Sequence, residues 1–358
     1  MRAKMKLTSK IIIRNILDLF DQYVPGGTVV LDHVRRARTD VASLARALRP
    51  WYSMEQKLPW LTLEVTNVCN SNCIFCAYQY QSRFRNGRGF LSDEIFDKAL
   101  GEYVGMGGRF VEFTPFAGEP LLDPKIIERI ETVNRLGAWT GFFTNGIRLN
   151  TIDVERLLNS GINALSVSTA PLEATMYELL YRNKHYMDVL QGLEKLLVAR
   201  NRVRKDLVIN ISFRSHIPMR EVLALSDFRE HIVPYLTPED RKNIIVNTRG
   251  LDTWGGQIKS ENMVGMMRLA LPPLIRRRPC AWTLSGLYVT WDGQVRACAC
   301  RYAETAYRDG KDELYLGNIL ESTLSEIWFG EDIKRLRRSF RRGNAPTVCK
   351  KCTMYRSC

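Results

Sequence analysis

The feature of this 358-residue sequence that most constrains its fold is a regular alternation of strand-like and helix-like segments between residues 60 and 248. The strand-like segments are short apolar runs, and they lie at 60–66, 109–113, 139–144, 164–168, 207–213 and 243–248. Segments with a helical spacing of apolar residues lie between them, at 92–103, 124–136, 152–159, 186–200 and 220–231. This order predicts an α/β fold with a parallel sheet, helices on its outer face and an active site at the carboxyl ends of the strands.

Three cysteines lie on one short loop directly after the first strand-like segment: Cys69, Cys73 and Cys76, spaced C-x3-C-x2-C. Three thiolates on one loop suit a metal centre. Structural zinc is held by four ligands, commonly as two close pairs, whereas a 4Fe-4S cluster held by three cysteines keeps one iron open for a small molecule. From the triplet alone, a zinc loop and three unrelated buried thiols stay open as alternatives.

The triplet resembles the signature of the radical S-adenosylmethionine (SAM) superfamily, in which an aromatic residue precedes the third cysteine, as Phe75 does here. In that family SAM chelates the open iron of a 4Fe-4S cluster through its amino and carboxylate groups. The resemblance implies that Cys69, Cys73 and Cys76 hold this cluster and that Phe75 packs near the adenine of SAM. It also implies that the strand–helix units form a partial (β/α)6 TIM-like barrel, an open relative of the eight-stranded barrel.

The turn after the second strand-like segment, TPFAGEP at residues 114–120, resembles the G-G-E-P loop of the same family. Ala117 stands where the family has its first glycine, and Gly118 and Glu119 complete the motif. The resemblance implies that the backbone of this turn and the Glu119 carboxylate hold the SAM ammonium, which donates a charge-assisted hydrogen bond to the carboxylate. A turn whose glycine serves only geometry is the alternative.

Further polar residues lie on or near the last three strand-like segments. Ser166 and Ser168 alternate along one strand and so share a face, and the resemblance assigns them to the ribose hydroxyls of SAM. Arg214 offers a fixed cation to the SAM carboxylate at the mouth of the site, and Asn247 is assigned to adenine or to the substrate. Satisfied strand serines and a capping amide are the structural alternatives.

A second group of cysteines lies near the end of the sequence. Cys280 and Cys298 frame a predicted β-hairpin with strands at 287–290 and 294–297, and Cys349, Cys352 and Cys358 follow in the spacing C-x2-C-x5-C. This pattern resembles the auxiliary-cluster region called SPASM, or its shortened form, the twitch domain. The resemblance implies one auxiliary 4Fe-4S cluster on Cys280, Cys298, Cys349 and Cys352, with Cys358 able to replace one of the terminal pair. Zinc is the alternative.

The nine cysteines as a set favour metal binding over disulfides, because three cluster early, six lie within residues 280–358, and the odd number leaves one unpaired. Cys300 is left over from the metal sets, and it is either a spare buried thiol or a hydrogen-atom donor near the active site. Cysteines reserved for metal predict a reducing, cytoplasmic location. No apolar run is long enough for a transmembrane segment, and polar residues interrupt any signal-peptide core near the start.

The net charge of +14 is concentrated in two basic stretches, residues 276–278 and 334–351. Such a charge attracts a nucleotide-linked substrate, an anionic peptide or glycan, RNA or an anionic membrane surface, and a solvated helix face explains it equally well. Charge alone does not identify the substrate, and we expect no nucleic acid partner.

Three segments follow from these patterns: an N-terminal helical extension at 1–56, a radical SAM partial barrel at 57–255 and an auxiliary-cluster domain at 256–358. The leading hypothesis is a radical SAM oxidoreductase that forms a 5'-deoxyadenosyl radical and abstracts hydrogen from a carbohydrate or aminocyclitol carbon, giving dehydrogenation (alcohol to ketone) or epimerisation. The first alternative is a maturase of a ribosomally made peptide, and the second is a zinc-stabilised nucleic-acid-binding protein. An electron donor such as flavodoxin or ferredoxin is the expected partner, and the expected substrate is a small molecule or a peptide, either anionic or neutral.

Overall fold

The computed structural model describes residues 37, 40, 58–83, 87–276, 278–298, 307–308 and 311–355. Apart from residues 37 and 40, the expected N-terminal extension over 1–56 lies outside the described residues, as do Cys300 and Cys358.

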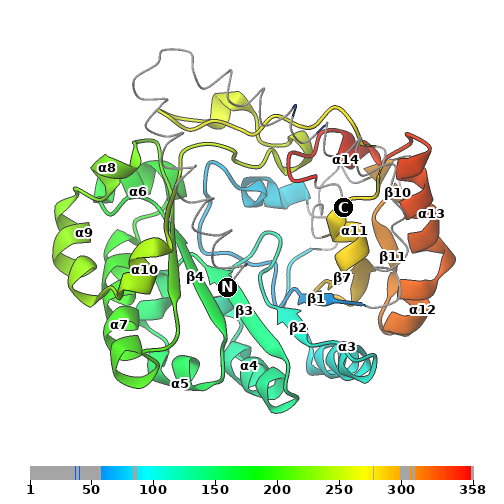
Figure 1. The fold of residues 1–358 in the computed structure, drawn as a ribbon, viewed down its shortest axis with the longest axis horizontal. Coiled ribbons are helices and arrows are strands. Elements are labelled where there is room, and N and C mark those ends of the chain that lie inside the picture. Colours follow the sequence, from blue (N-terminus) through cyan, green and yellow to red (C-terminus); the bar gives the residue numbers. More distant parts are fainter. Residues whose placement is uncertain are drawn as a thin grey trace.

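Six parallel strands form the centre of the molecule and follow one another in space as they do in the sequence (Figure 1). They are β1 (Trp60–Leu63), β2 (Phe110–Glu112), β3 (Trp139–Thr144), β4 (Ala164–Thr169), β5 (Ile209–Arg214) and β6 (Ile244–Asn247). The sheet does not close on itself, because β6 is one of its edges. The predicted α/β class and the partial TIM-like barrel are therefore confirmed. The first strand is shorter than expected: it ends at Leu63, and Thr66 forms only an isolated bridge with Phe90.

Helices cover the outer face of these strands: four lie at the expected places, one was expected wrongly and two were missed. The helices that were predicted are α3 (Asp93–Gly105), α4 (Ile126–Arg135), α5 (Val154–Asn159) and α7 (Tyr186–Val203). The helix expected at 220–231 is wrong: it is split into α8 (Met219–Val222) and α9 (Ser226–His231), because Leu225 between them has an extended backbone. Two short helices were missed, α6 (Ala174–Tyr181) and α10 (Pro238–Lys242), since five to eight residues carry little periodicity.

The sheet continues from the barrel into the C-terminal part of the chain. β7 (Gly286–Val289) pairs in parallel with β1, β8 (Gln294–Arg296) pairs antiparallel with β7, and β11 (Tyr315–Asn318) forms the other edge. This confirms the predicted hairpin, whose turn ends at Gly293 with a φ of 84° that favours glycine. The proposed boundary between residues 255 and 256 stays a prediction, and one nine-stranded sheet runs across it.

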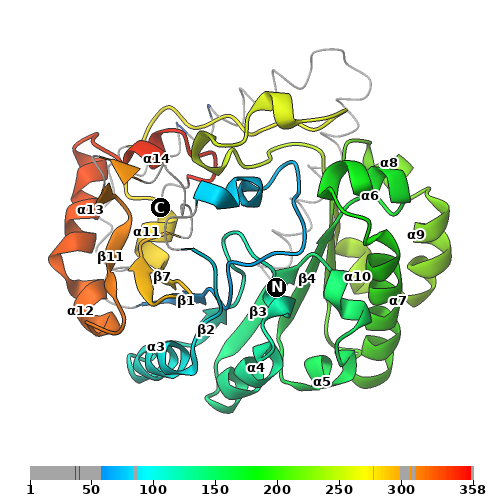
Figure 2. The same ribbon diagram turned by 180° about the vertical axis from the view of Figure 1, so that it is seen from behind.

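The remaining C-terminal elements pack around this sheet extension, at the opposite end of the molecule from α7 and α9 (Figures 1 and 2). They are α11 (Ala281–Ser285), β9 (Tyr307–Arg308), β10 (Lys311–Asp312), α12 (Leu324–Phe329), α13 (Glu331–Arg341) and α14 (Thr347–Lys350). The basic helix α13 is amphipathic: it buries Ile333, Leu336 and Phe340, and the guanidinium of its buried Arg337 lies 4.4 Å from the Trp328 ring centroid.

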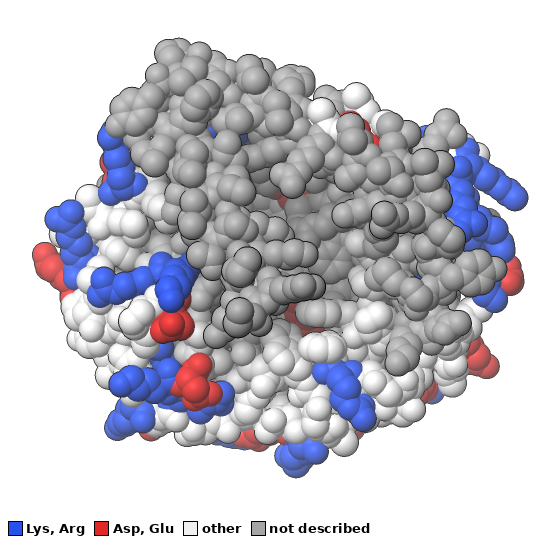
Figure 3. All heavy atoms as spheres, viewed as in Figure 1, with Lys and Arg blue, Asp and Glu red and all other residues white. Residues whose placement is uncertain are grey.

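The exposed face of α13 accounts for part of the basic charge. Lys334 and Arg338 both form ion pairs with Glu331, at 3.5 and 3.0 Å. Basic side chains gather over this helix at the right edge of Figure 3, and other Lys and Arg side chains lie in separate groups around the periphery of that face. Within the described residues, every helix is too short or too polar to span a bilayer.

Candidate radical SAM active site

The three early cysteines surround one cavity at the carboxyl ends of the parallel strands. Cys69, Cys73 and Cys76 line this cavity, which has a volume of about 360 Å³ and which we call the SAM cavity. Four residues that the sequence assigned to SAM line the same cavity: Phe75, Ser168, Arg214 and Asn247. Gly118 and Glu119 line it too, whereas Ser166 is buried on β4 and is not among its walls.

The cysteine loop is attached to α6, a helix that the sequence did not reveal. The amide of Asn72 donates to the carbonyl of Tyr181, and the amide of Ile74 donates to that of Leu180, at 3.2 and 3.0 Å. The Ser71 hydroxyl donates to the same Tyr181 carbonyl and lies 3.2 Å from the Cys73 sulfur. Carbonyls in the last turn of a helix lack intrahelical partners, so α6 provides acceptors that fix the loop.

The thiols of the loop share a buried and mutually repulsive environment. Burial raises the pKa of Cys69, of Cys73 and of Cys76, the last to about 11. For Cys69, the nearby Glu119 carboxylate and the two other thiolates raise the pKa further. Three thiolates held this closely need a cationic centre to stay ionised. No group of three or more His, Cys, Asp or Glu in the described part of the chain converges on a point suited to one metal ion. A cubane binds each cysteine through a different iron, so thiols arranged around a cavity fit it.

Gly118 lies where two loops touch. A Cβ at this position would come within 2.4 Å of the Thr66 carbonyl oxygen and 3.1 Å of the Asn67 Cα, so the contact excludes any side chain. The preceding Ala117, which stands in place of a family glycine, is buried and packs against Tyr78 in the segment after the cysteine loop. The turn is therefore packed directly on the loop that carries the cysteines.

The Glu119 carboxylate is fully buried and ties this turn to the end of β3. It accepts hydrogen bonds from the Leu121 amide at 3.1 Å, the Thr144 hydroxyl at 2.6 Å and the Asn145 amide at 2.7 Å. Burial raises the pKa of Glu119 to about 7, and these three hydrogen bonds oppose the rise. Its contacts in the structure are thus with protein donors, and contact with the SAM ammonium stays a prediction.

The late cysteines come together from three separate segments of the chain. Cys280 precedes α11, Cys298 follows β8, Cys349 lies in α14, and Cys352 follows that helix. All four line one small cavity, the auxiliary cavity, with apolar neighbours such as Leu314 and Val348. The Arg276 guanidinium donates to the Cys352 carbonyl at 3.3 Å, and the cysteine thiolates beside it oppose the fall that burial causes in its pKa. Four thiols around one enclosed space, beside a cation, fit a four-cysteine cluster.

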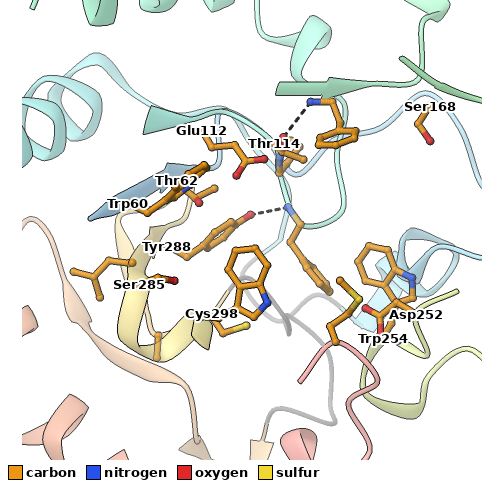
Figure 4. Close-up of a pocket in the computed structure, with 18 of the residues that line it drawn as sticks. Trp60, Thr62, Glu112, Thr114, Ser168, Asp252, Trp254, Ser285, Tyr288 and Cys298 are labelled. Atoms are coloured by element: carbon orange, nitrogen blue, oxygen red, sulfur yellow. Dashed lines mark hydrogen bonds between the residues drawn. The ribbon is translucent and has the colours of Figure 1, made fainter. Parts of the chain in front are cut away.

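A third cavity, of about 410 Å³, lies between the two cysteine sets, and we call it the substrate cavity (Figure 4). It shares Ser168, Arg214 and Trp254 with the SAM cavity, and Cys298 and Trp282 with the auxiliary cavity. Met354 lines all three cavities. The substrate cavity therefore connects the two cysteine sets.

Two models of known families match this chain. The model of the radical SAM superfamily matches residues 63–225, and that of an iron-sulfur cluster-binding domain, SPASM, matches residues 280–353. The chain belongs to the radical SAM superfamily. As a radical SAM enzyme with a SPASM-type region, it binds a 4Fe-4S cluster, an auxiliary cluster and SAM.

Curated relatives of this radical SAM enzyme match over less than half of the chain. A GTP 3',8-cyclase of Klebsiella pneumoniae is 30% identical over 147 residues, which are 40% of this chain and 44% of the cyclase. A GTP 3',8-cyclase of Mannheimia succiniciproducens is 28% identical over 146 residues, 40% of this chain and 42% of the cyclase. The chain thus spans less than half the length of these relatives.

Solved structures with a similar fold cover more of the radical SAM chain. BtrN in complex with AdoMet (SAM) and 2-DOIA has a TM-score of 0.51 at 18% identity, over 82% of this chain and 92% of BtrN. Streptococcus suis SuiB bound to its precursor peptide SuiA has a TM-score of 0.55 at 13% identity, over 88% of this chain and 74% of SuiB. At these identities the likeness shows the fold alone.

Sequence reasoning missed several residues of this radical SAM site. Glu112, Trp254, Tyr288 and Met354 line the substrate cavity, and none belongs to a recognised motif. A signal existed for Glu112, because it is an acidic residue inside a strand that otherwise carries apolar side chains. Trp254 had none: its indole donates to the Phe75 carbonyl at 2.8 Å, a contact between residues far apart in the sequence.

Proposed function

We propose that this radical SAM enzyme abstracts a hydrogen atom from a carbon of a carbohydrate or aminocyclitol, giving dehydrogenation of an alcohol to a ketone or epimerisation. The observation that carries the proposal is the substrate cavity, which adjoins the SAM cavity on one side and the auxiliary cavity on the other. Its volume of about 410 Å³ suits one small ring-shaped molecule. The likeness to BtrN, solved with AdoMet and 2-DOIA, supports a small-molecule substrate.

In this proposal Cys69, Cys73 and Cys76 hold the SAM-binding cluster, and Cys280, Cys298, Cys349 and Cys352 hold the auxiliary cluster, with Cys358 able to replace one of the last pair. When bound and reduced, the first cluster and SAM together supply a 5'-deoxyadenosyl radical, chemistry that belongs to the cofactors.

The chain's own side chains bind and orient the two small molecules. Arg214 and Ser168 line both the SAM cavity and the substrate cavity, so they are suited to fix the SAM carboxylate and ribose at the edge that faces the substrate. Phe116 and Trp254 pack edge to face, with ring centroids 4.5 Å apart, and form part of the substrate cavity wall. These rings would limit the access of water to a substrate radical.

The oxidative outcome is favoured over epimerisation within this proposal. Cys298 and Trp282 line both the substrate cavity and the auxiliary cavity, so an electron acceptor in the auxiliary cavity would lie beside the substrate. Epimerisation needs a hydrogen-atom donor, and the sequence offers Cys300 for this role.

The test is anaerobic turnover of reconstituted enzyme with reductant, SAM and three substrate pools: aminocyclitols and sugars, GTP, and peptides. We expect 5'-deoxyadenosine with a ring substrate, and a product two mass units lighter if the outcome is oxidation. Epimerisation gives a product whose mass is unchanged in ordinary water and which carries one deuterium after turnover in heavy water. This product should be absent with Cys300→Ala. Substrate-dependent 5'-deoxyadenosine with peptides or GTP alone would refute the proposal and, with peptides, favour the maturase.

A further inference from the structure

The substrate cavity differs in chemical character at its two ends. The end shared with the SAM cavity carries Arg214, Ser168 and Asp252. The other end, toward β1, β2 and β7, is lined by Glu112, Thr62 and aromatic rings (Figure 4). We call this second part the carboxylate end.

Glu112 and Thr62 lie in one row across three neighbouring parallel strands. Thr62 of β1 is in register with Glu112 of β2 on one side and with Tyr288 of β7 on the other. Residues in register on parallel strands point to the same face of a sheet, and all three line the cavity. On the far side of Glu112 the row continues with Gly141 of β3, where a Cβ would come within 2.6 Å of the Ala164 carbonyl oxygen.

The Glu112 carboxylate has no cationic partner among the described residues, whose ion pairs do not include it. Burial raises the pKa of Glu112, and the side chains of Thr114 and Trp60 beside it oppose the rise. The other acidic side chain of the cavity, Asp252, is already engaged, since it accepts hydrogen bonds from the Thr353 hydroxyl at 2.7 Å and the Trp254 amide at 3.0 Å.

Aromatic rings surround this carboxylate. Trp60, Trp282 and Tyr288 line the carboxylate end, and Phe116 lies beside them, because its amide donates to the Tyr288 hydroxyl at 2.7 Å. The faces of such rings carry partial negative charge and attract a cation. A carboxylate together with an aromatic wall and a hydroxyl acceptor is a combination that suits an alkylammonium group, which has three donors and no acceptor.

We propose that the carboxylate end binds a primary ammonium group of the substrate, with Glu112 as its counter-ion and Thr62 as a second acceptor. This inference rests on the proposed function and narrows it to amine-bearing substrates, among which we favour a ring amine because of the size of the cavity. The assignment of the SAM cavity does not depend on this ammonium site.

The test measures binding without turnover. Anaerobically reconstituted enzyme, loaded with SAM and kept without reductant, is titrated calorimetrically with scyllo-inosamine, with scyllo-inositol, which has a hydroxyl in place of the ammonium, and with Nα-acetyl-lysine amide. We expect the inosamine to bind at least about tenfold more tightly than the inositol, the effect of one charge-assisted hydrogen bond. In Glu112→Gln this preference should fall to about threefold or less.

Glu178→Gln is the matched control, because it removes the same charge from an exposed position on α6 and should leave both affinities unchanged. The iron content and the SAM affinity of Glu112→Gln show whether this variant folds. If it does not fold, the difference in affinity between the inosamine and the inositol in the wild-type enzyme decides whether the site prefers an ammonium group. In a different outcome, the lysine amide is the ligand that binds more tightly than the inositol and loses this advantage in Glu112→Gln, while the inosamine binds no better than the inositol. This result keeps the ammonium site and assigns it to a peptide substrate.

Equal binding of the two rings without Glu112-dependent binding of the lysine amide, binding of none of the three ligands, or a preference that survives in Glu112→Gln would overturn the inference. The proposed function fails separately. Turnover of a neutral sugar, with no preference for amines in binding, would keep the proposed function and reject the ammonium site. Glu112-dependent binding of the amine without any SAM cleavage would keep the ammonium site and reject the proposed function.

Discussion

The two cysteine sets of this protein are built in opposite ways. The SAM-cavity cysteines lie within eight residues of one loop, and backbone hydrogen bonds to α6 fix that loop in place. The auxiliary cysteines come from positions between 280 and 352 and meet only because the hairpin, α11 and α14 pack together. A local set depends on one loop, whereas a dispersed set depends on the tertiary structure, so the two should respond differently to the same kind of damage.

The largest expected effect is on the iron content and the chemistry. Replacing Cys69, Cys73 and Cys76 together with Ala should lower the iron content from about eight to about four atoms per chain and abolish SAM cleavage, because only the auxiliary cluster remains. Cys280→Ala should also reduce the iron content, but reductive SAM cleavage to 5'-deoxyadenosine should persist. Iron analysis and chromatography of 5'-deoxyadenosine measure both results. Loss of all iron in either variant would show that the two sites are not independent.

Two glycines sharpen the comparison, because a Cβ at either position would lie at nearly the same short distance from a backbone carbonyl oxygen. A Cβ at Gly118 would lie 2.4 Å from the Thr66 carbonyl oxygen, and one at Gly286 would lie 2.5 Å from the Trp60 carbonyl oxygen. Each substitution to Ala should lower the free energy of unfolding by about 1–3 kcal/mol, because backbone atoms must shift.

The affected function should differ between these two variants. Gly118→Ala should weaken SAM binding and leave the auxiliary cluster intact, whereas Gly286→Ala should disturb the pairing of β7 with β1 and reduce auxiliary-cluster loading. Gly101→Ala is the control: nothing lies within 4 Å of its Cβ, and Ala in the interior of α3 should add about 0.5–1 kcal/mol. Denaturant unfolding and SAM titration measure these effects. Equal losses of SAM affinity in Gly118→Ala and Gly286→Ala would contradict the distinction.

A smaller effect is expected where the two regions meet. The Thr353 hydroxyl, next to Cys352, donates to the Asp252 carboxylate at 2.7 Å and accepts from the Thr253 amide at 3.1 Å. Thr353→Val should lower the free energy of unfolding by at most about 3 kcal/mol, because it leaves the Asp252 carboxylate and the Thr253 amide without the hydroxyl. Substrate binding should weaken more than iron loading, which calorimetry and iron analysis separate. An unchanged substrate affinity would show that this contact does not shape the shared cavity.

The smallest effect concerns Glu112, a barrel residue that faces the region between the cysteine sets. Burial raises its pKa in the folded state, so the ionised carboxylate destabilises the fold at pH values above that raised pKa. Glu112→Gln should therefore be slightly more stable than the wild type at pH 8, by no more than about 2 °C in Tm. The difference should shrink as the pH falls and vanish below the ordinary Glu pKa of 4.5. Thermal unfolding across this range tests the sign, and a less stable variant at pH 8 would contradict it.

Most of the barrel could be read from the sequence because its signals are local. The strands at 139–144 and 164–169 match their predicted positions to within one residue, and the cysteine triplet and the G-E-P turn lie at strand ends, as expected. The helices α6 and α10 were missed because five to eight residues carry little periodicity and because helices this short are stabilised by packing against their neighbours. Yet α6 is what anchors the cysteine loop.

The roles of individual side chains were harder to predict than their neighbourhood. Glu119 was expected at the SAM ammonium, and the structure shows its carboxylate accepting three hydrogen bonds from the protein. A motif identifies which residue types occur at a turn, whereas the direction of a carboxylate depends on which donors the next strand presents, here Thr144 and Asn145.

The sequence by itself determined the fold class, the SAM-cavity cysteines, the hairpin and the family, since each rests on residue spacing within a short stretch. Only the tertiary structure decided how the two regions join. The pairing of β7 with β1 places Tyr288 beside Thr62 and Glu112, residues that are far apart in the sequence, and so forms one wall of the substrate cavity. Pairing between distant strands depends on hydrogen bonds and packing that no local pattern encodes, and for this reason the cavity and the place of the Glu112 carboxylate in it were not visible before the fold was known.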